Sequence, residues 1–204
     1  GLDYPFENEF NFTHQVGGEL EKGTITGYKG GIGSALGFVA TYDTRDNVVN
    51  AYSGHILELS SYFNSSYLGG NFNYVNFNFE FGKYWELKKD NVLAVNVIMN
   101  SNFGSVPFLD MAKVGGDAMI RGYASNRFSD NHFIGAQIEY RFPLWCRFGM
   151  VVFTGVGDVY NTPSDIKLNT LKYTVGAGIR FAINSKERLN VRFDYGFGRK
   201  SNAF

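Results

Sequence analysis

The sequence predicts an all-β protein, specifically an antiparallel transmembrane β-barrel to which this chain contributes about eight strands. Three observations support this fold class. Apolar and polar residues alternate with a period of two over stretches of about ten residues, the pattern of strands with two different faces. One parity carries aliphatic and aromatic residues, whereas the other carries glycine, asparagine, threonine and the mid-strand charges. Aromatic residues also gather near strand ends, as at a membrane interface. These residues are Tyr62, Phe63, Tyr67, Tyr84, Trp85, Phe142, Trp145 and Phe148.

The alternation is clearest in the C-terminal third of the chain. Within 171–183, Val175 and Ile179 fall on one face, and Thr174 and Arg180 fall on the other. The same pattern repeats in 134–142 and 189–197, and weaker versions occupy 35–45, 54–63, 72–82, 91–100 and 147–157. Almost no segment shows the 3.6-residue apolar stripe of a helix, so the expected architecture contains strands and loops only.

Periodicity alone does not separate an outer-membrane barrel from a soluble lipocalin-like barrel or sandwich, because each has one apolar face. Strand length favours the membrane, since a tilted transmembrane strand has about 9–11 residues and a globular strand about 5–6. The charges also favour it, because a Lys or Arg that faces mid-bilayer lipid costs about 2–4 kcal/mol. The charged residues that avoid the apolar parity are Glu58, Glu80, Glu139, Arg141, Arg180, Arg192 and Asp194.

The composition excludes several other classes of protein. The 19 basic and 19 acidic residues leave no net charge, and no basic stretch suits a nucleic-acid partner. The single Cys146 cannot form an internal disulfide, which excludes a disulfide-stapled secreted domain. No run approaches the roughly 18 apolar residues of a membrane-spanning helix. The 25 glycines are about 12% of the chain, against about 7% in an average protein, and they fit a crowded barrel interior.

The domain organisation is expected to be simple. Residues 1–30 are rich in turn-forming glycine, so we expect a loop, linker or partial strand there, with at most one strand around Glu9–Val16. Residues 31–204 are expected to form the barrel strands. No basic and apolar leader opens the chain, so Gly1 is expected to begin a mature protein or a fragment.

Two short segments stand out from the alternation. The first closes the first clear strand and consists of Tyr42, Asp43, Thr44, Arg45, Asp46 and Asn47. Asp and Asn are ordinary turn-forming residues at a strand end, so this segment alone is weakly informative. The second consists of two stretches that follow one another in the chain, 136–143 and 153–159. Glu139 and Arg141 share the inner parity there with Phe153, Gly155 and Gly157, as ordinary polar residues of a barrel lumen would.

A long segment, about 103–131, separates two good strands and contains Ile120, Arg121, Gly122 and Tyr123. Segments of more than about 12–15 residues without their own secondary structure are usually functional or disordered. This one is too apolar and too rich in glycine to be disordered. Two interpretations remain: an extracellular loop with Arg121 in solvent, or a loop that folds into the barrel and places Arg121 against interior carboxylates.

Taken together and in this order, the segments resemble the barrel of the BamA/TamA superfamily, also called the bacterial surface antigen family. The matching stretches are YDTRDN at 42–47, GGDAMIRGY at 115–123, IEYRFP at 138–143, FTGVGDV at 153–159, VGAGIRF at 175–181 and RFDYGFG at 192–198. They cover about 160 residues, and the combination is more specific than any single stretch. The resemblance implies a 16-stranded barrel, of which this chain looks like the C-terminal half, with the Arg-Gly-Tyr loop inserted into the lumen.

The resemblance also implies a buried salt bridge. The loop arginine of the family, which matches Arg121, contacts a glutamate that matches Glu139 and an aspartate one strand later. Here Gly155 occupies that aspartate position, and Asp158 has the opposite parity. A buried arginine still needs a partner, since removing one member of a buried pair costs about 3–5 kcal/mol. Glu139 is therefore the first expected partner and Asp194 the second.

The sequence offers little for bond chemistry. One cysteine and three scattered histidines give no zinc pattern, there is no Gly-x-Ser-x-Gly elbow, and we expect no cofactor and no metal. An outer-membrane phospholipase would need a Ser–His pair, for which only His55 with Ser53 and His132 with Ser129 are candidates.

Three functions remain open. The leading one, which the resemblance implies, is an integral barrel of the Gram-negative outer membrane that inserts or translocates other proteins. Its partners would be outer-membrane lipid, client or passenger proteins and other subunits of an assembly machinery. The second is a secretion pore for a passenger, since some members are barrels attached to patatin-like lipases. The third is a small, closed structural barrel without a transport role, whose eight strands would leave an interior filled by side chains.

Overall fold

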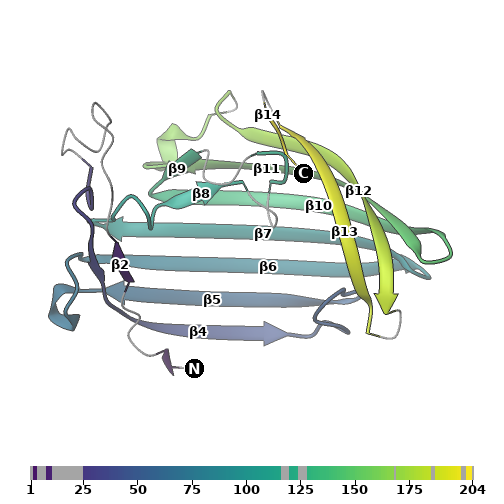
Figure 1. Ribbon diagram of the computed structural model, residues 1–204, viewed down its shortest axis with the longest axis horizontal. Helices are drawn as coiled ribbons and strands as arrows, with labels where there is room; N and C mark the ends of the chain where they lie inside the picture. The colour runs from purple at the N-terminus through teal and green to yellow at the C-terminus, as the bar shows by residue number, and fades with distance from the viewer. Residues whose placement is uncertain are drawn as a thin grey trace.

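The protein is an all-β chain whose strands form one large curved sheet (Figure 1). The computed structural model describes residues 2–3, 8–10, 25–115, 120–123, 128–167, 169–184, 187–198 and 201–203. Its helical content in these residues is two short 3-10 helices, η1 (Ser66–Leu68) and η2 (Pro163–Asp165). The described residues contain no helix that is long and apolar enough to cross a lipid bilayer.

Eight long strands make up most of the sheet, and each pairs antiparallel with its neighbour along the chain. They are β4 (Ala35–Asp43), β5 (Gly54–Asn64), β6 (Tyr74–Lys88), β7 (Asn91–Gly104), β10 (His132–Trp145), β11 (Phe148–Tyr160), β12 (Lys172–Asn184) and β13 (Leu189–Gly198). The eight expected strands are thus confirmed. β6 and β7 are longer than the alternation indicated, because polar and charged residues at their ends still pair across the ladder.

Six short strands complete the structure. β1 (Leu2–Asp3) and β14 (Ser201–Ala203) pair with β4 and β13 at the two edges of the sheet. β2 (Asn8–Phe10) pairs with β3 (Gly31–Gly33), and β8 (Ala112–Val114) pairs with β9 (Phe128–Asp130). Of the strand expected around Glu9–Val16, only the part within β2 is described, and residues 11–16 lie outside the described residues.

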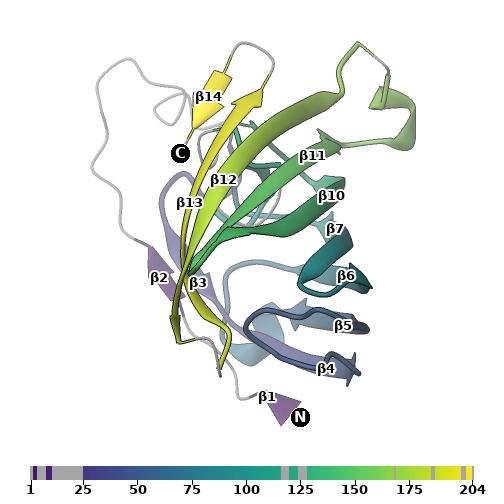
Figure 2. The same cartoon turned by 90° about the vertical axis from the view of Figure 1, so that its right-hand side faces the viewer.

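The sheet curves into an arc with two different faces (Figure 2). Its outer face presents exposed apolar side chains, among them Ile138 at 48%, Val175 at 59% and Phe193 at 65% exposure. In a soluble barrel or sandwich, this face would be the buried core. An apolar outer face over so many strands is instead the lipid-facing surface of a membrane barrel.

The aromatic residues near the strand ends divide between the two faces. Phe63, Trp85 and Trp145 are exposed on the outside, as expected for an interfacial girdle. Tyr84 is buried on the inner face, under the guanidinium of Arg141. Tyr62 also faces inward, against Gly37. Including both in the girdle was wrong, because adjacent residues of a strand point to opposite faces, so only one member of each aromatic pair faces lipid.

The two ends of the sheet differ in the length of their connections. At one end, turns of a few residues join β6 to β7, β10 to β11 and β12 to β13, and the first two contain Asp90 and Cys146 with positive φ. We call this the short-turn end. The 44–53 segment between β4 and β5 lies at the same end. The opposite end carries the connections 65–73, 105–131 and 161–171, the last two of which are longer than the 44–53 segment.

The register aligns inner-face residues into rows across the sheet. One row runs from Ala94 of β7 through Glu139 of β10 and Phe153 of β11 to Gly176 of β12 and Gly196 of β13. The row therefore combines one carboxylate, one ring and two glycines on the concave face, and it forms the floor of the site described next.

Candidate functional site

The long connection between β7 and β10 folds back onto the concave face, as the second interpretation of this loop expected. Ala112, Val114, Ile120 and Tyr123 pack with Phe133 of β10 in a buried apolar cluster. β8 lies against β7, β10 and β11. Because these contacts hold the described parts of the segment against the wall, Arg121 enters the interior with only 8% of its surface exposed.

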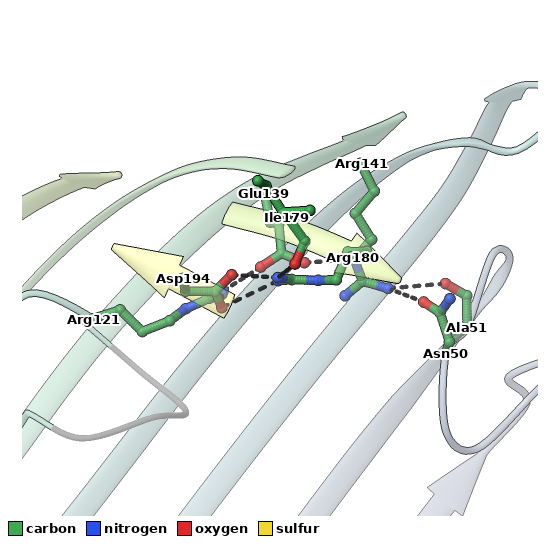
Figure 3. A network of polar contacts seen from close by, with 8 residues as sticks. All are labelled: Asn50, Ala51, Arg121, Glu139, Arg141, Ile179, Arg180 and Asp194. Carbon is green, nitrogen blue, oxygen red and sulfur yellow. Dashed lines mark hydrogen bonds and ion pairs between the residues drawn. The ribbon is translucent and has the colours of Figure 1, made fainter. Parts of the chain in front are cut away.

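Arg121 lies between two carboxylates on different strands (Figure 3). Its Nη2 contacts the carboxylate of Glu139 in β10, and its Nη1 lies 2.6 Å from Oδ2 of Asp194 in β13. The guanidinium also stacks over the ring of Phe153, 4.2 Å from the ring centroid. The expected contact between Arg121 and Glu139 is present, and Asp194, the second choice, is a partner at the same time.

Each carboxylate binds a second arginine, so charges of opposite sign alternate through the network (Figure 3). Arg141 Nε lies 2.5 Å from Glu139 Oε1. Arg180 contacts the Asp194 carboxylate with both terminal nitrogens, one of them at 3.1 Å. This alternation compensates the desolvation of each charge, since a buried ion is tolerated only when it is paired and hydrogen-bonded.

The network of ion pairs extends from β10, on the concave face of the sheet, to the 44–53 segment. Arg141 Nη1 donates to Asn50 Oδ1 at 2.9 Å and to the carbonyl oxygen of Ala51 at 3.3 Å. Arg188, in the turn before β13, lies 2.5 Å from Asp46 Oδ2 and stacks over the ring of Tyr52. Asp46 and Arg188 are 142 positions apart. The segment therefore links β4 and β5 to strands on the other side of the arc.

Glycines on the wall make room for the loop. Gly122 has φ +119°, which a side chain rarely adopts, and an added Cβ would lie 3.0 Å from the carbonyl carbon of Gly196. A Cβ on Gly196 would lie 2.5 Å from the carbonyl oxygen of Arg121, and one on Gly198 would lie 2.8 Å from the Tyr123 ring. Gly157 likewise receives the end of the Ile120 side chain. Backbone contact between loop and wall thus depends on glycine on both sides.

These features, a curved sheet with an apolar outer face and an arginine-bearing loop on its inner face, are matched by a known family. The sequence profile of the Omp85 superfamily domain matches residues 24–203 of the chain. The chain belongs to the Omp85 superfamily. It is accordingly an integral β-barrel protein of the Gram-negative outer membrane, as the sequence predicted.

The structural comparison agrees with the Omp85 assignment. The sheet is similar to the crystal structure of BamA from Haemophilus ducreyi lacking POTRA domains 1–3, with a TM-score of 0.68 and 14% sequence identity. The match covers 83% of this chain and 39% of the BamA chain, so this chain spans less than half of that structure. No curated protein sequence matches the chain significantly.

In an Omp85 barrel, the two ends of the sheet can be oriented. Outer-membrane barrels have short periplasmic turns and longer extracellular loops. The short-turn end, with the 44–53 segment and Arg188, is therefore the periplasmic end. The long segment that carries Arg121 begins and ends at the extracellular side and descends along the inner wall.

The strand-end motif predicted at 42–47 is held mainly by contacts between residues close together in the chain, with one contact to a distant residue. Arg45 Nη2 binds Asp43 Oδ2 at 2.6 Å, and Asn47 Oδ1 accepts from the backbone of Val49 at 2.9 Å. Tyr42 faces outward beside the His55 ring. Asp46 is the exception, because it also reaches Arg188.

The contacts of Asp46 also favour the ionised form of its carboxyl group. Partial burial favours the neutral carboxyl, but the hydrogen bond from Arg188 and the backbone N–H groups of Ser53 and Tyr52 hold the pKa of Asp46 below its ordinary value. Asp46 therefore stays charged at neutral pH and keeps the 44–53 segment attached to the β12–β13 turn.

Gly155 occupies the position where the family has an aspartate, and Asp158 is the nearest alternative in the sequence. Gly155 lies next to Thr174 and Gln137, where an added Cβ would meet ordinary contact distances of 3.4 to 3.6 Å. Asp158 does not substitute for the missing aspartate, since it binds Lys172 and accepts from Thr170 at 2.7 Å. Asp194 instead supplies the second carboxylate to Arg121.

Sequence reasoning missed Asn50 and Arg188 as members of the network and assigned no partner to Arg180. The inner parity of Arg180 was a usable signal, but nothing local marks the contacts of 44–53. The histidines considered for bond chemistry have other neighbours: His55 Nδ1 lies 3.0 Å from Thr44 Oγ1, and His132 packs between the rings of Phe103 and Tyr160. Within the described residues, no group of three or more His, Cys, Asp or Glu side chains could hold a metal ion.

Proposed function

We propose that this chain forms part of the wall of a barrel that inserts other proteins into the outer membrane or moves them across it. Membership of the Omp85 superfamily supports the general class. The observation that carries the proposal is the double attachment of Arg121 to Glu139 and Asp194. These carboxylates lie on β10 and β13, so the loop braces a wall of four strands from inside.

The work of such a barrel depends on its wall and needs no bond chemistry. A strand at an open edge of a sheet offers unpaired N–H and C=O groups, to which a client strand can add by β-augmentation. The brace at Arg121 keeps the curvature of β10 to β13 while an edge opens elsewhere. The surrounding outer-membrane lipid, the client and further subunits of an assembly machinery are the proposed partners.

A secretion pore for a passenger protein is the second candidate. The polar inner face favours it, since Asn76, Asn78, Asn100 and Asn102 form a connected row of hydrogen-bonded amides on β6 and β7. Such a surface suits the passage of an extended polypeptide. A closed structural barrel of eight strands is less well supported, because β4 and β13 do not pair with each other in the described part of the chain.

The test is reconstitution of the full-length protein in liposomes with an unfolded outer-membrane barrel as client. We expect the protein to accelerate client insertion, measured by the protease-resistant fraction, and Arg121→Ala to reduce the rate. Glu58→Gln is the matched control, since Glu58 lies on the same inner face and outside the network. Equal insertion with and without the protein would refute an insertase. Release of a soluble passenger into the liposome without client insertion would favour the secretion pore.

A further inference from the structure

Lys83 of β6 is a basic residue that points toward lipid. Its neighbour Tyr84 is buried on the inner face, and its Cα partners are His55 of β5 and Val95 of β7, so Lys83 lies on the outer face. Lys88 lies beyond a register shift at the end of β6, and at the regularly paired positions of the eight long strands no other lysine or arginine points outward. Because lipid disfavours a charge on this face, the position of Lys83 needs a physical reason.

The depth of Lys83 in the sheet places it near a membrane surface. Its Cα partner His55 is the second residue of β5, and Tyr42 is the last but one residue of β4, so Lys83 is level with two strand ends. Nζ of Lys83 lies over the ring of Trp85, 5.8 Å from the ring centroid, and Trp85 is two residues closer to the short-turn end. The ammonium is thus directed away from the hydrocarbon and toward the headgroups of the periplasmic leaflet.

The surroundings of Lys83 provide hydrogen-bond donors but no carboxylate. Lys83 forms no ion pair with an acidic residue in the described part of the chain. The His55 ring lies 5.4 Å from the Tyr42 ring, between centroids, and its Nδ1 lies 3.0 Å from Thr44 Oγ1. In the tautomer whose Nδ1 accepts from Thr44, Nε2 carries the proton and can donate to a ligand. Tyr42 is 60% exposed and Trp85 is 41% exposed, so a hydroxyl and an indole N–H are also accessible. We call these four outward-facing residues the outer rim cluster: Tyr42, His55, Lys83 and Trp85.

The chemistry of the outer rim cluster selects a phosphodiester. Phosphate is the anion that phospholipids place at headgroup depth, and its oxygens accept hydrogen bonds from an ammonium, an imidazole or an indole N–H. The cluster has no acidic member, so it can neutralise a phosphate but offers no partner to the ammonium of a zwitterionic headgroup. Leu57 and Phe81 form the next outward-facing pair toward the middle of β5 and β6, and they give the acyl chains of the same lipid an apolar surface.

We propose that the outer rim cluster binds the phosphate of an anionic phospholipid in the periplasmic leaflet, with a phosphatidylglycerol-type headgroup as the ligand class and Lys83 as the main contact. The site lies on the outside of the sheet, so it depends neither on the brace around Arg121 nor on the proposed function. A lipid bound here contacts β4, β5 and β6 together at their periplasmic ends.

The first experiment measures binding of a fluorescently labelled phosphatidylglycerol to the full-length protein in nonionic detergent micelles. Unlabelled phosphatidylglycerol should displace the labelled lipid at a lower mole fraction than phosphatidylethanolamine or phosphatidylcholine does. Lys83→Gln should weaken binding about fivefold, because one basic residue near a membrane surface contributes about that factor. Lys83→Arg keeps the charge and should retain binding. Equal displacement by the anionic and the zwitterionic lipids would overturn the proposal.

Lys89→Gln is the matched control for the loss of charge. Lys89 is exposed in the β6–β7 turn at the same end of the sheet and is not part of the outer rim cluster, so this variant loses the same charge close by. Its affinity for phosphatidylglycerol should equal that of the unmodified protein. Equal losses in Lys83→Gln and Lys89→Gln would show a general attraction of anionic lipid to the basic turn and would overturn the site.

Inorganic phosphate separates a lipid site from a site for a soluble anion. At matched ionic strength, inorganic phosphate should displace the labelled lipid no better than chloride does, because the acyl chains against Leu57 and Phe81 contribute to binding. Displacement by millimolar phosphate, but not by chloride, would assign the outer rim cluster to a soluble anion and overturn the lipid assignment.

Discussion

Arg121 and Asp194 are 73 positions apart in the chain, yet Nη1 of Arg121 lies 2.6 Å from Oδ2 of Asp194. This contact and the one to Glu139 attach the long extracellular segment to two strands of the inner wall. Because β11 and β12 lie between these strands, Arg121 connects the first and last of four neighbouring strands.

Removing the arginine should be costly. Arg121→Met leaves Glu139 and Asp194 without a shared partner, and the loss of one member of a buried pair destabilises by about 3–5 kcal/mol. We expect a lower urea midpoint in lipid bilayers. Arg45→Met is the control, because the Asp43 carboxylate and the Val48 carbonyl that Arg45 binds lie within three positions of it in the chain. The two variants should differ clearly, and equal midpoints would contradict the brace.

Gly196→Ala should displace the loop. The new Cβ would lie 2.5 Å from the carbonyl oxygen of Arg121, which is backbone and cannot rotate away. Gly155→Ala is the matched control, since Gly155 is also an inner-face glycine but its Cβ would have 3.4 Å of space. We expect Gly196→Ala to destabilise by about 1–3 kcal/mol through overpacking, measured by the thermal transition in detergent. A larger effect of Gly155→Ala would mean that the loop does not rest on β13.

A charged residue on the outer face of the sheet should destabilise the folded protein. Ile138 lies in the middle of β10 and is 48% exposed on the apolar side. Ile138→Arg should cost about 2–4 kcal/mol, as for a charge at the bilayer midplane. Asn96→Arg, on the inner face of β7 opposite Gln137 of β10, should cost far less. The fraction folded in liposomes, read from gel mobility without heating, measures both. Similar losses would contradict the assignment of the two faces.

The contact between Asp46 and Arg188 should depend on pH. Burial acts in the opposite direction, but hydrogen bonds to the charged carboxylate lower the pKa of Asp46, so folding favours the ionised form. The contribution is present above the unfolded pKa of about 3.9 and is lost as pH falls through the folded value. It should be below about 1 kcal/mol, because the pair is partly exposed. Asp46→Asn should remove it at pH 7, and the two proteins should converge in stability near pH 2. A constant difference between them from pH 7 to pH 2 would contradict this linkage.

Sequence patterns predicted much of this structure because they reflect local constraints. The alternation of apolar and polar residues placed the eight long strands. The family resemblance implied Glu139 as the partner of Arg121, and the inner parity of Asp194 made it the second choice. The short β8–β9 pair was not predicted, since strands of three residues are too short for a period to be recognised. Contacts of Asn50 and Arg188 depend on how far the sheet curves, which no local pattern encodes.

Cross-linking of the loop to the wall tests the central claim most directly. The Ile120 side chain packs in one buried cluster with Phe133 of β10, so Ile120→Cys and Phe133→Cys, in a Cys146→Ser background, should form a disulfide or a short-reagent cross-link in intact outer membranes. We expect a product that depends on both cysteines and disappears on reduction. Absence of the product, together with rapid labelling of Ile120→Cys by a membrane-impermeant maleimide from outside, would show that the loop lies outside the lumen and would contradict the brace.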